Sequence, residues 1–457
     1  MTKSSFLSNY WSEILLYTIA VACLVTTAAQ YPLSTTFPIG GDAATHIRTV
    51  QHIFTDPIFS LQKIANSWYP VAYILFSINA IIPHANWPII FSWWMTLGQV
   101  LTGLALGLFV YRLSGPKASA IAIALWAMTP ITMTSFFEDG TMAQLWSLPW
   151  VILFFERMLA KSYKGMALFA FLALFSHPIT ALVLIATLAV SAMIFDKRVA
   201  LLALAITAIA SIVIYFRQDI LQISSHEASK YVPELLHGFY LPWVLAALYG
   251  WFCIIKSHKH HALLLTTLGS FFAVSLMLGA NDLLGIGFWT NRLDAYIVIF
   301  VVITGATGVA EILKNIQSPI LTTCIASLLC TGLTMSAFHD NQNIYKRYES
   351  PSTYSRIHPQ ELESLAWMNN NLPSNITLFT SGETRNYEWI PVLTHFRWAL
   401  EKADGRTLLQ QSSGAQNPVV VFFTRKDNTP DDVSSNQAQY TLLYKNPSVQ
   451  IYKINSL

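Results

Sequence analysis

Apolar segments that recur along most of the chain constrain its fold more than any other feature. A helix needs about 20 predominantly apolar residues to cross a bilayer, and runs close to that length follow one another up to residue 337. Charged residues make up only 11% of the sequence and hydrophobic residues 54%, whereas a soluble domain carries roughly 25% charged residues. The chain is therefore predicted to be an α-helical polytopic integral membrane protein.

The expected spans number about eleven. They cover residues 14–29, 87–110, 118–134, 142–155, 165–176, 178–195, 199–216, 240–255, 262–280, 295–312 and 319–337. The first follows Lys3 and ends in small residues, a pattern that a cleaved signal peptide shares. We expect this segment to remain uncleaved as a membrane helix, because the distribution of basic residues over the loops is then explained more simply.

The apolar run from Tyr69 to Ile82 is treated differently. It has about 14 residues, too few for a bilayer crossing. We therefore expect a juxtamembrane helix at the outer interface.

Basic residues give the orientation. With a cytoplasmic N-terminus, the inner loops collect most of them: Arg112, Lys117, Arg157, Lys161, Lys164, Lys197, Arg198, Lys256, Lys259 and Lys314. Counting the run from Tyr69 to Ile82 as a span would move these loops, which all follow it in the sequence, to the outside. The sequence thus predicts a protein of the bacterial inner or plasma membrane with its N-terminus in the cytoplasm.

The tail after Ala337 has a different character. A helical spacing of apolar residues covers 359–369, a strand pattern covers 417–424, and two strands around a turn at Asn446-Pro447 cover 440–453. An odd number of spans places this tail outside the cytoplasm. We therefore expect two domains, a membrane domain at 1–337 and a small extracytoplasmic mixed α/β domain at 338–457.

Composition also excludes several functions. The formal net charge of +3 is too small for a nucleic-acid surface, and the four cysteines lie in apolar runs with no metal-binding spacing. Most spans carry no ionisable residue near their middle, which argues against an ion-coupled transporter. The tract from Lys256 to His261 resembles a metal-binding sequence, but on the cytoplasmic side it is expected to be a solvated basic flank.

A polar stretch after the first span contains the candidate chemistry. Gly40 and Gly41 allow a sharp turn, Asp42 stands where a helix could begin, and His46 follows four residues later on the same face, close to Arg48. The alternative is that Asp42 only caps a surface helix.

Further polar groups fall on the same predicted face. Glu138 and Asp139 precede a glycine on the second outer loop, where they could also form a turn or cap the next helix. His177 precedes a proline and is expected to pack or to form a hydrogen bond, while Arg292 precedes a late span.

The order of these elements resembles the C-type glycosyltransferase superfamily. The resemblance rests on the acidic first outer loop (Gly41-Asp42-Ala-Ala-Thr-His46), the juxtamembrane Tyr69-Pro70 helix, two spans and the acidic second loop. Members include the oligosaccharyltransferase catalytic subunit, the protein mannosyltransferases and the aminoarabinose transferases, and they use polyprenyl-phosphate-linked sugars. The resemblance implies a membrane transferase that moves such a sugar to a glycan, lipid or protein acceptor on the extracytoplasmic face.

The resemblance also implies residue roles. Asp42 matches the catalytic acidic residue of the first loop, with His46 beside it as a second catalytic candidate. Arg292 and Arg48 are candidates for binding the donor phosphate. Trp389 and Arg397 resemble an outer-domain segment near the active site.

A divalent metal is a further implication. Glu138 or Asp139 matches a position that, in metal-using members, helps to hold a cation such as Mg²⁺ or Mn²⁺, together with Asp42. Here the two acidic residues are adjacent, whereas the oligosaccharyltransferase pattern separates them by one residue. The Trp-Trp-Asp motif is also missing from the sequence, so asparagine is not implied as the acceptor.

The chemistry requires a base for the acceptor hydroxyl and a cation for the leaving phosphate. Asp42 is the predicted base and Arg292 the predicted cation, with inversion at the anomeric carbon. The alternative function is a transport protein, such as a flippase, or a non-catalytic assembly protein of cell-envelope glycan biosynthesis. A flippase should show a polar path through the spans, and the sequence shows none.

Overall fold

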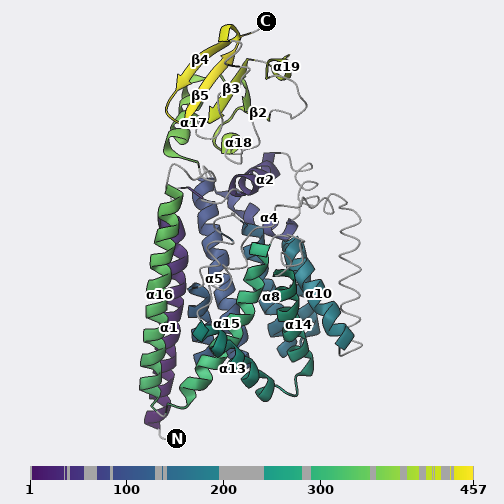
Figure 1. Cartoon of the computed structure of the whole chain (residues 1–457), viewed down its shortest axis with the longest axis vertical. Helices are drawn as coiled ribbons and strands as arrows, with labels where there is room; N and C mark the ends of the chain where they lie inside the picture. The colour runs from purple at the N-terminus through teal and green to yellow at the C-terminus, as the bar shows by residue number, and fades with distance from the viewer. Residues whose placement is uncertain are drawn as a thin grey trace.

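The computed structural model divides into a helical bundle and a small sheet domain stacked at one end of it (Figure 1). The N-terminus lies at the opposite end of the bundle. The structure describes residues 3–34, 37–38, 42–55, 69–82, 86–128, 136, 141–194, 241–279, 290–316, 318–349, 357–380, 389–400, 408–413, 415, 417–423, 433 and 437–455.

The bundle consists of long apolar helices. They are α1 (Lys3–Ser34), α5 (Trp87–Ser114), α6 (Pro116–Ala127), α8 (Met142–Leu159), α9 (Tyr163–Ser176), α10 (Pro178–Ile194), α13 (Leu241–Ser257), α14 (Ala262–Gly279), α15 (Thr290–Lys314) and α16 (Pro319–Glu349). In the described part of the chain, 4 helices are long and apolar enough to cross a membrane. The expected span at 199–216 lies outside the described residues, so the count of about eleven stays a prediction.

Prolines explain where several helices begin. Proline is well tolerated at the first helical position, where its missing N–H would have no partner inside the helix. Helices α6, α10 and α16 all begin at a proline. The residue before a proline favours an extended backbone, and His177 is extended, with φ −160° and ψ 134°. The extended residue His177, directly before Pro178, thus separates α9 from α10.

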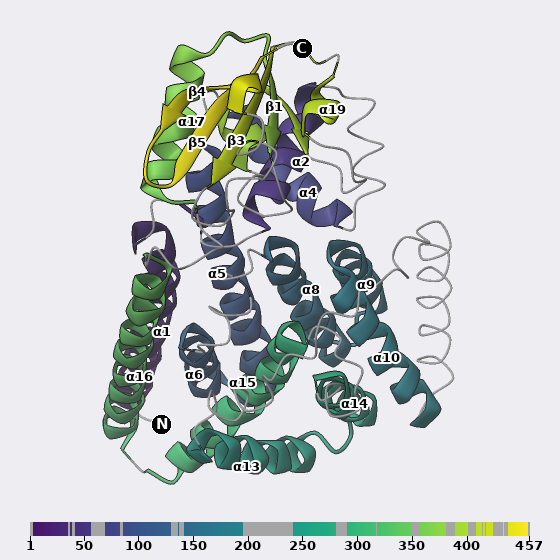
Figure 2. The same cartoon turned by 45° about the horizontal axis from the view of Figure 1, so that its top comes forward.

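The run from Tyr69 to Ile82 forms no membrane-length helix, as the sequence predicts. It forms α4 (Pro70–Ser77) and the short 3₁₀ helix η1 (Ile78–Ile81). Helix α4 lies beside α2 (Ala43–Thr55), near the sheet end of the bundle (Figures 1 and 2).

Small residues allow α13 and α15 to approach closely. Gly250 and Gly308 face each other, and a Cβ atom added at Gly308 would lie 2.0 Å from the carbonyl oxygen of Ala246. On the other side of the bundle α1 packs along α16 (Figure 2). There Gln30 Nε2 donates to the Phe338 carbonyl at 3.0 Å, and Asn341 Nδ2 donates to Gln30 Oε1 at 3.3 Å.

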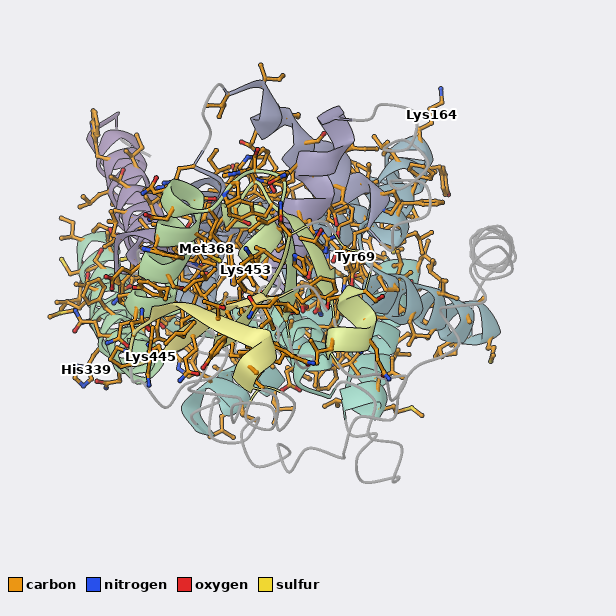
Figure 3. The ribbon with its side chains drawn as sticks, turned by 90° about the horizontal axis from the view of Figure 1, so that it is seen from above. Tyr69, Lys164, His339, Met368, Lys445 and Lys453 are labelled. Carbon is orange, nitrogen blue, oxygen red and sulfur yellow. The ribbon has the colours of Figure 1, made fainter. Side chains whose placement is uncertain are left out.

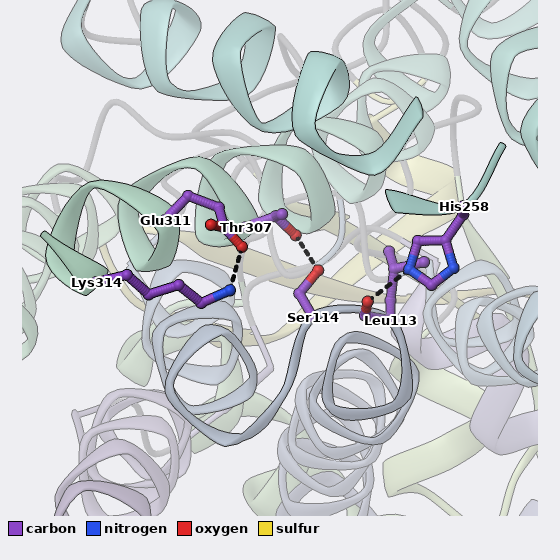
Figure 4. A network of polar contacts seen from close by, with 6 residues as sticks. All are labelled: Leu113, Ser114, His258, Thr307, Glu311 and Lys314. Carbon is purple, nitrogen blue, oxygen red and sulfur yellow. Dashed lines mark hydrogen bonds and ion pairs between the residues drawn. The ribbon is translucent and has the colours of Figure 1, made fainter. Parts of the chain in front are cut away.

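The loops predicted to be cytoplasmic meet at the end of the bundle away from the sheet. The buried Glu156 carboxylate pairs with Arg112 Nη1 at 2.6 Å and with Arg157 Nε at 2.8 Å. Figure 4 shows the neighbouring network, in which Ser114 Oγ lies 2.9 Å from Thr307 Oγ1 and Lys314 pairs with Glu311.

The histidine tract contributes to this same end. His258 Nε2 lies 2.7 Å from the Leu113 carbonyl oxygen, also drawn in Figure 4. A ring nitrogen of the tract thus bonds to backbone oxygen, which ties the loop after α13 to the end of α5.

The outer domain contains a five-stranded mixed sheet in the order β2-β1-β3-β5-β4. Its strands are β1 (Thr377–Thr380), β2 (Arg397–Leu400), β3 (Pro418–Phe423), β4 (Tyr440–Lys445) and β5 (Val449–Ile454), with α17 (Pro359–Asn371), α18 (Ile390–Leu393) and α19 (Leu408–Ser412) around them. Strand β1 runs parallel to β2 and β3, whereas β5 runs antiparallel to β3 and β4.

The predicted helix at 359–369 and the predicted strands at 417–424 and 440–453 are confirmed by α17, β3 and the β4–β5 hairpin. The side chain of Asn446 closes the hairpin turn, because its Oδ1 accepts from the N–H groups of Ser448 and Val449 at 2.9 and 2.7 Å. Strands β1 and β2 are not predicted by the sequence pattern. Helix α16 runs on to Glu349, twelve residues past the boundary expected at Ala337.

Candidate active site

Three predicted site residues lie at the start of α2. The Asp42 carbonyl accepts the N–H of His46 at 3.1 Å, so Asp42 stands at the N-terminus of the helix. His46 is buried, whereas Asp42 and Arg48 are half-buried. The carboxylate of Asp42 lies at the helix end that favours negative charge. This position fits the capping role and leaves the side chain partly accessible for chemistry.

Aromatic rings enclose His46. Its ring lies 5.6 Å from that of Tyr69, 5.6 Å from that of Tyr73 and 6.1 Å from that of Phe91, with which it stacks at 14°. His46 Nδ1 lies 3.0 Å from the Tyr73 hydroxyl oxygen. Helices α2, α4 and α5 together hold this imidazole in place.

The electrostatics of this pair favour a neutral phenol. Burial raises the pKa of Tyr73 well above its ordinary value, and the neighbouring Tyr69 and the negative charge of Asp42 raise it further. Tyr73 therefore keeps its proton throughout the neutral pH range.

His177 extends the ring cluster to the break between α9 and α10. Its side chain is buried and stacks on Tyr69 with ring centroids 5.3 Å apart and an interplanar angle of 3°. The sequence predicts a packing role for His177, and the stacked ring agrees with it. The sequence analysis does not single out Tyr69 and Tyr73 as site residues. One sequence feature that marks Tyr69 is shared with His177, because both stand directly before a proline that begins a helix.

Trp389 connects the outer domain to this region. It precedes α18, is buried, and packs edge-on against Phe37 with centroids 4.7 Å apart. Helix α18 also contacts α2. Seen from the outer-domain end, Tyr69 lies inside the outline of the molecule, while Lys164 and His339 lie at its edge (Figure 3). The segment from Trp389 through α18 therefore contacts both Phe37 and α2, the helix that carries His46.

Arg292 lies in the first turn of α15, and Arg397 is the first residue of β2, paired in register with Thr377. Only their backbone positions are described. Glu138 and Asp139 lie outside the described residues. The convergence of Asp42, Asp139 and Arg292 on one cleft therefore stays a prediction.

A buried polar chain ties the start of α15 to the other helices near the site. Tyr296, one turn after Arg292, bonds through its hydroxyl to Thr180 Oγ1 at 2.5 Å, and Thr180 bonds to Ser147 Oγ at 2.5 Å. Thr180 lies three residues after His177. The backbone that carries Arg292 is thus held near the α9–α10 break by the membrane helices.

The residues that the structure describes contain no group of three or more His, Cys, Asp or Glu side chains that could hold a metal ion. Asp42 and His46 are two such side chains on one helix, and the other expected ligands, Glu138 and Asp139, are not among the described residues. The described residues alone do not form a metal site, and the divalent metal stays a prediction.

Solved structures with the same architecture include those of two proteins. ArnT from Cupriavidus metallidurans in the apo state has a TM-score of 0.62 and 12% identity, over 96% of this chain and 97% of that chain. The same protein bound to undecaprenyl phosphate also has a TM-score of 0.62, with 8% identity over 99% and 98% of the two chains.

The second protein is the oligosaccharyltransferase AglB from Archaeoglobus fulgidus. In complex with an inhibitory peptide and a dolichol-phosphate it has a TM-score of 0.57 and 13% identity, over 98% of this chain and 74% of that chain. A complex of the Archaeoglobus enzyme with Zn and sulfate has a TM-score of 0.56 and 13% identity.

The sequence itself matches no family model and no curated protein. At identities of 8–13% the likeness is one of fold. It extends over nearly the whole chain, from the membrane bundle to the outer sheet domain. The chain therefore has the fold of the C-type glycosyltransferase superfamily.

Proposed function

We propose that this protein is a membrane glycosyltransferase that moves a sugar from a polyprenyl-phosphate-linked donor to an acceptor on the extracytoplasmic face. The observation that carries the proposal is the full-length match to ArnT, whose bound state holds undecaprenyl phosphate. The AglB complex with a dolichol-phosphate supports the same class of donor. The polyprenyl tail of such a donor would lie against the apolar bundle, with its phosphate near α2 and α4.

The proposed reaction is a single displacement. The acceptor hydroxyl oxygen forms a bond to the anomeric carbon, the bond from that carbon to the phosphate oxygen breaks, and polyprenyl phosphate leaves with the electron pair. Asp42 takes the hydroxyl proton. Arg292, with Arg48 as a second candidate, stabilises the negative charge on the leaving phosphate. Attack from the side opposite the phosphate inverts the anomeric configuration.

The proposal includes the topology expected from the sequence. Residues 1–337 form the membrane domain of a bacterial inner or plasma membrane protein, and residues 338–457 form an outer domain that faces the acceptor. The acceptor is a glycan, a lipid or a protein. Trp389 and Arg397 are the candidates for the acceptor side, since α18 contacts the helix that follows Asp42.

Binding and transfer can be tested separately. Purified protein in lipid nanodiscs should bind undecaprenyl phosphate and should bind undecaprenol, which lacks the phosphate, much more weakly, as measured by native mass spectrometry. Arg292→Ala should weaken the binding of undecaprenyl phosphate. Lys164→Ala, at the edge of the molecule on α9, is the matched control and should leave binding unchanged.

Transfer is then followed with a panel of polyprenyl-phosphate sugars, by release of polyprenyl phosphate. Asp42→Asn keeps the shape of the side chain and removes its basicity, so turnover should fall by roughly 10²-fold or more. Donor binding should persist in this variant. Full transfer by Asp42→Asn would reject Asp42 as the base. Equal binding of both lipids would reject a phosphate-linked donor. Rescue of a deletion strain by Asp42→Asn would favour a non-catalytic assembly protein.

A further inference from the structure

Helix α4 and the 3₁₀ helix η1 that continues it have two apolar faces. One face is buried, because Ala72, Tyr73 and Phe76 point inward where α4 contacts α2, α8 and α9. The other face carries four isoleucines that are 53%, 57%, 74% and 50% exposed: Ile74, Ile78, Ile81 and Ile82. Positions i, i+4, i+7 and i+8 lie on one side of a helix. These four side chains are called the isoleucine ridge below.

An apolar ridge of this kind requires a cover. Large exposed apolar patches mark contacts with a membrane or with another protein, because apolar surface is unfavourable in water. The segment from Tyr69 to Ile82 also contains no Asp, Glu, Lys, Arg or His residue. A charged rim, which would favour a surface in water, is therefore missing from this segment.

The polar side chains beside the ridge bond to the backbone of their own helix. Ser77 Oγ donates to the Ile74 carbonyl at 2.7 Å, and Asn79 Nδ2 donates to the Phe76 carbonyl at 2.8 Å. In the hydrocarbon of a bilayer polar groups have no water to bond to, so they must find partners within the protein. The hydroxyl of Ser77 and the amide hydrogen of Asn79 meet this requirement.

The membrane-spanning helix α5 begins close to the ridge. Only four residues separate Ile82 from Trp87, the first residue of α5, and the rings of Phe76 and Trp87 lie 5.8 Å apart. Helix α5 is long and apolar enough to cross a membrane. Exposed apolar side chains recur at helical spacing along it: Ile89, Trp93, Leu97, Leu104, Leu108 and Tyr111. The lipid layer that covers the outer end of α5 is therefore within reach of the ridge.

We infer that the isoleucine ridge inserts into the acyl chains of the outer leaflet and anchors α4 to the membrane. Lipid is the occupant because the ridge adjoins the exposed stripe of a membrane span and has no charged group to pair with a protein partner. The opposite face of α4 carries Tyr73, whose hydroxyl oxygen lies 3.0 Å from His46 Nδ1. The anchor therefore sets the level of His46 relative to the bilayer surface.

Site-directed spin labelling tests which medium covers the ridge. Full-length protein whose four cysteines are replaced by alanine receives a single new cysteine for a nitroxide label, and is studied in lipid nanodiscs that hold one copy each. Oxygen concentrates in hydrocarbon, whereas a nickel chelate stays in water. The ratio of the two accessibilities therefore reports whether the label lies in lipid or in water.

Ile78→Cys and Ile74→Cys place independent labels on the ridge. Leu97→Cys is the lipid control, since Leu97 is 41% exposed on α5. Lys445→Cys is the water control, at an exposed position of the outer domain that is labelled in Figure 3. The ratio of oxygen to nickel accessibility at the ridge should exceed the ratio at Lys445 by about threefold or more, because an interfacial helix buries its apolar face about 5–10 Å deep.

A ridge ratio no higher than that at Lys445 would mean that water covers the ridge, and would overturn the inference. The same measurement in proteoliposomes detects a protein cover. Low accessibility to both reagents there, or dipolar broadening between labels on two copies, would overturn the inference as well. High ratios at both ridge positions in nanodiscs and in proteoliposomes are the expected result. No readout depends on transferase activity, so a failure here is distinct from a failure of the proposed function.

Discussion

The contact between α13 and α15 offers a sharp test of the bundle packing. A Cβ atom added at Gly308 would lie 2.0 Å from the carbonyl oxygen of Ala246 and 3.0 Å from the backbone nitrogen of Gly250. Real Cβ atoms essentially never approach other atoms more closely than 3.0 Å. Gly308→Ala therefore requires the two helix backbones to separate by about 1 Å, and no side-chain rotation can relieve the clash.

The size of the effect follows from two opposing terms. Overpacking costs typically about 1–3 kcal/mol, and a clash between two backbones belongs at the upper end of that range or above. Alanine in place of glycine inside a helix contributes about 1 kcal/mol in return. We expect Gly308→Ala to lower the free energy of unfolding by about 2 kcal/mol or more.

Gly305 is the matched control, one turn earlier on the same helix. A Cβ atom there meets nothing closer than the Trp243 carbonyl oxygen at 3.9 Å. Gly305→Ala should therefore raise the free energy of unfolding, by up to about 1 kcal/mol. The assay is SDS titration of purified protein in mild detergent, followed by circular dichroism. Equal stability of the two variants, or a stabilised Gly308→Ala, would refute the close backbone contact.

Three further predictions concern charge and topology. Glu156→Gln should lower the free energy of unfolding by about 1.5–3 kcal/mol, because a buried carboxylate loses its bonds to Arg112 and Arg157. The matched change Glu311→Gln, in the more exposed pair with Lys314, should cost less than about 1 kcal/mol in the same titration. A similar loss in both variants would contradict the burial argument. Tyr73, whose pKa is raised by burial, stays neutral in the folded state while the unfolded state ionises above pH ~10, so stability should fall as pH rises past that point. Tyr73→Phe should reduce that fall by up to about 1.4 kcal/mol per pH unit, and an unchanged pH slope would argue against a buried phenol. Reporter fusions should be active outside the cytoplasm at the C-terminus and inside at Lys161, as the basic loops predict. Exchanged activities would reverse the assignment of the outer face.

Much of the architecture follows from local pattern. Apolar runs and prolines predict the long helices and several of their first residues, because helix starts depend on nearby backbone chemistry. The β4–β5 hairpin is also predictable, since its strands are adjacent in sequence and joined by a short turn closed by Asn446. Asp42 and His46 could be placed on one helix by their spacing alone.

The rest of the site depends on tertiary contacts between distant segments. The residues that contact His46 come from α4 and α5. His177 stacks on Tyr69, so two residues that each precede a proline meet although they lie far apart in the sequence. Strands β1 and β2 each have only four residues and pair in parallel across a long connection. No periodicity in so short a run distinguishes a strand from a loop.

The sequence alone predicts a bundle of apolar membrane helices, an acidic loop after the first helix and a small domain at the C-terminal end. These features depend on the hydrophobicity and charge of local segments, which can be read without the tertiary structure. Only the tertiary structure decided which side chains meet at that loop. The surroundings of His46 are a clear instance, since they include a phenol hydroxyl from α4 and an aromatic ring from α5. Hydrogen bonds act over about 3 Å, and no sequence pattern records which groups the fold brings within that distance.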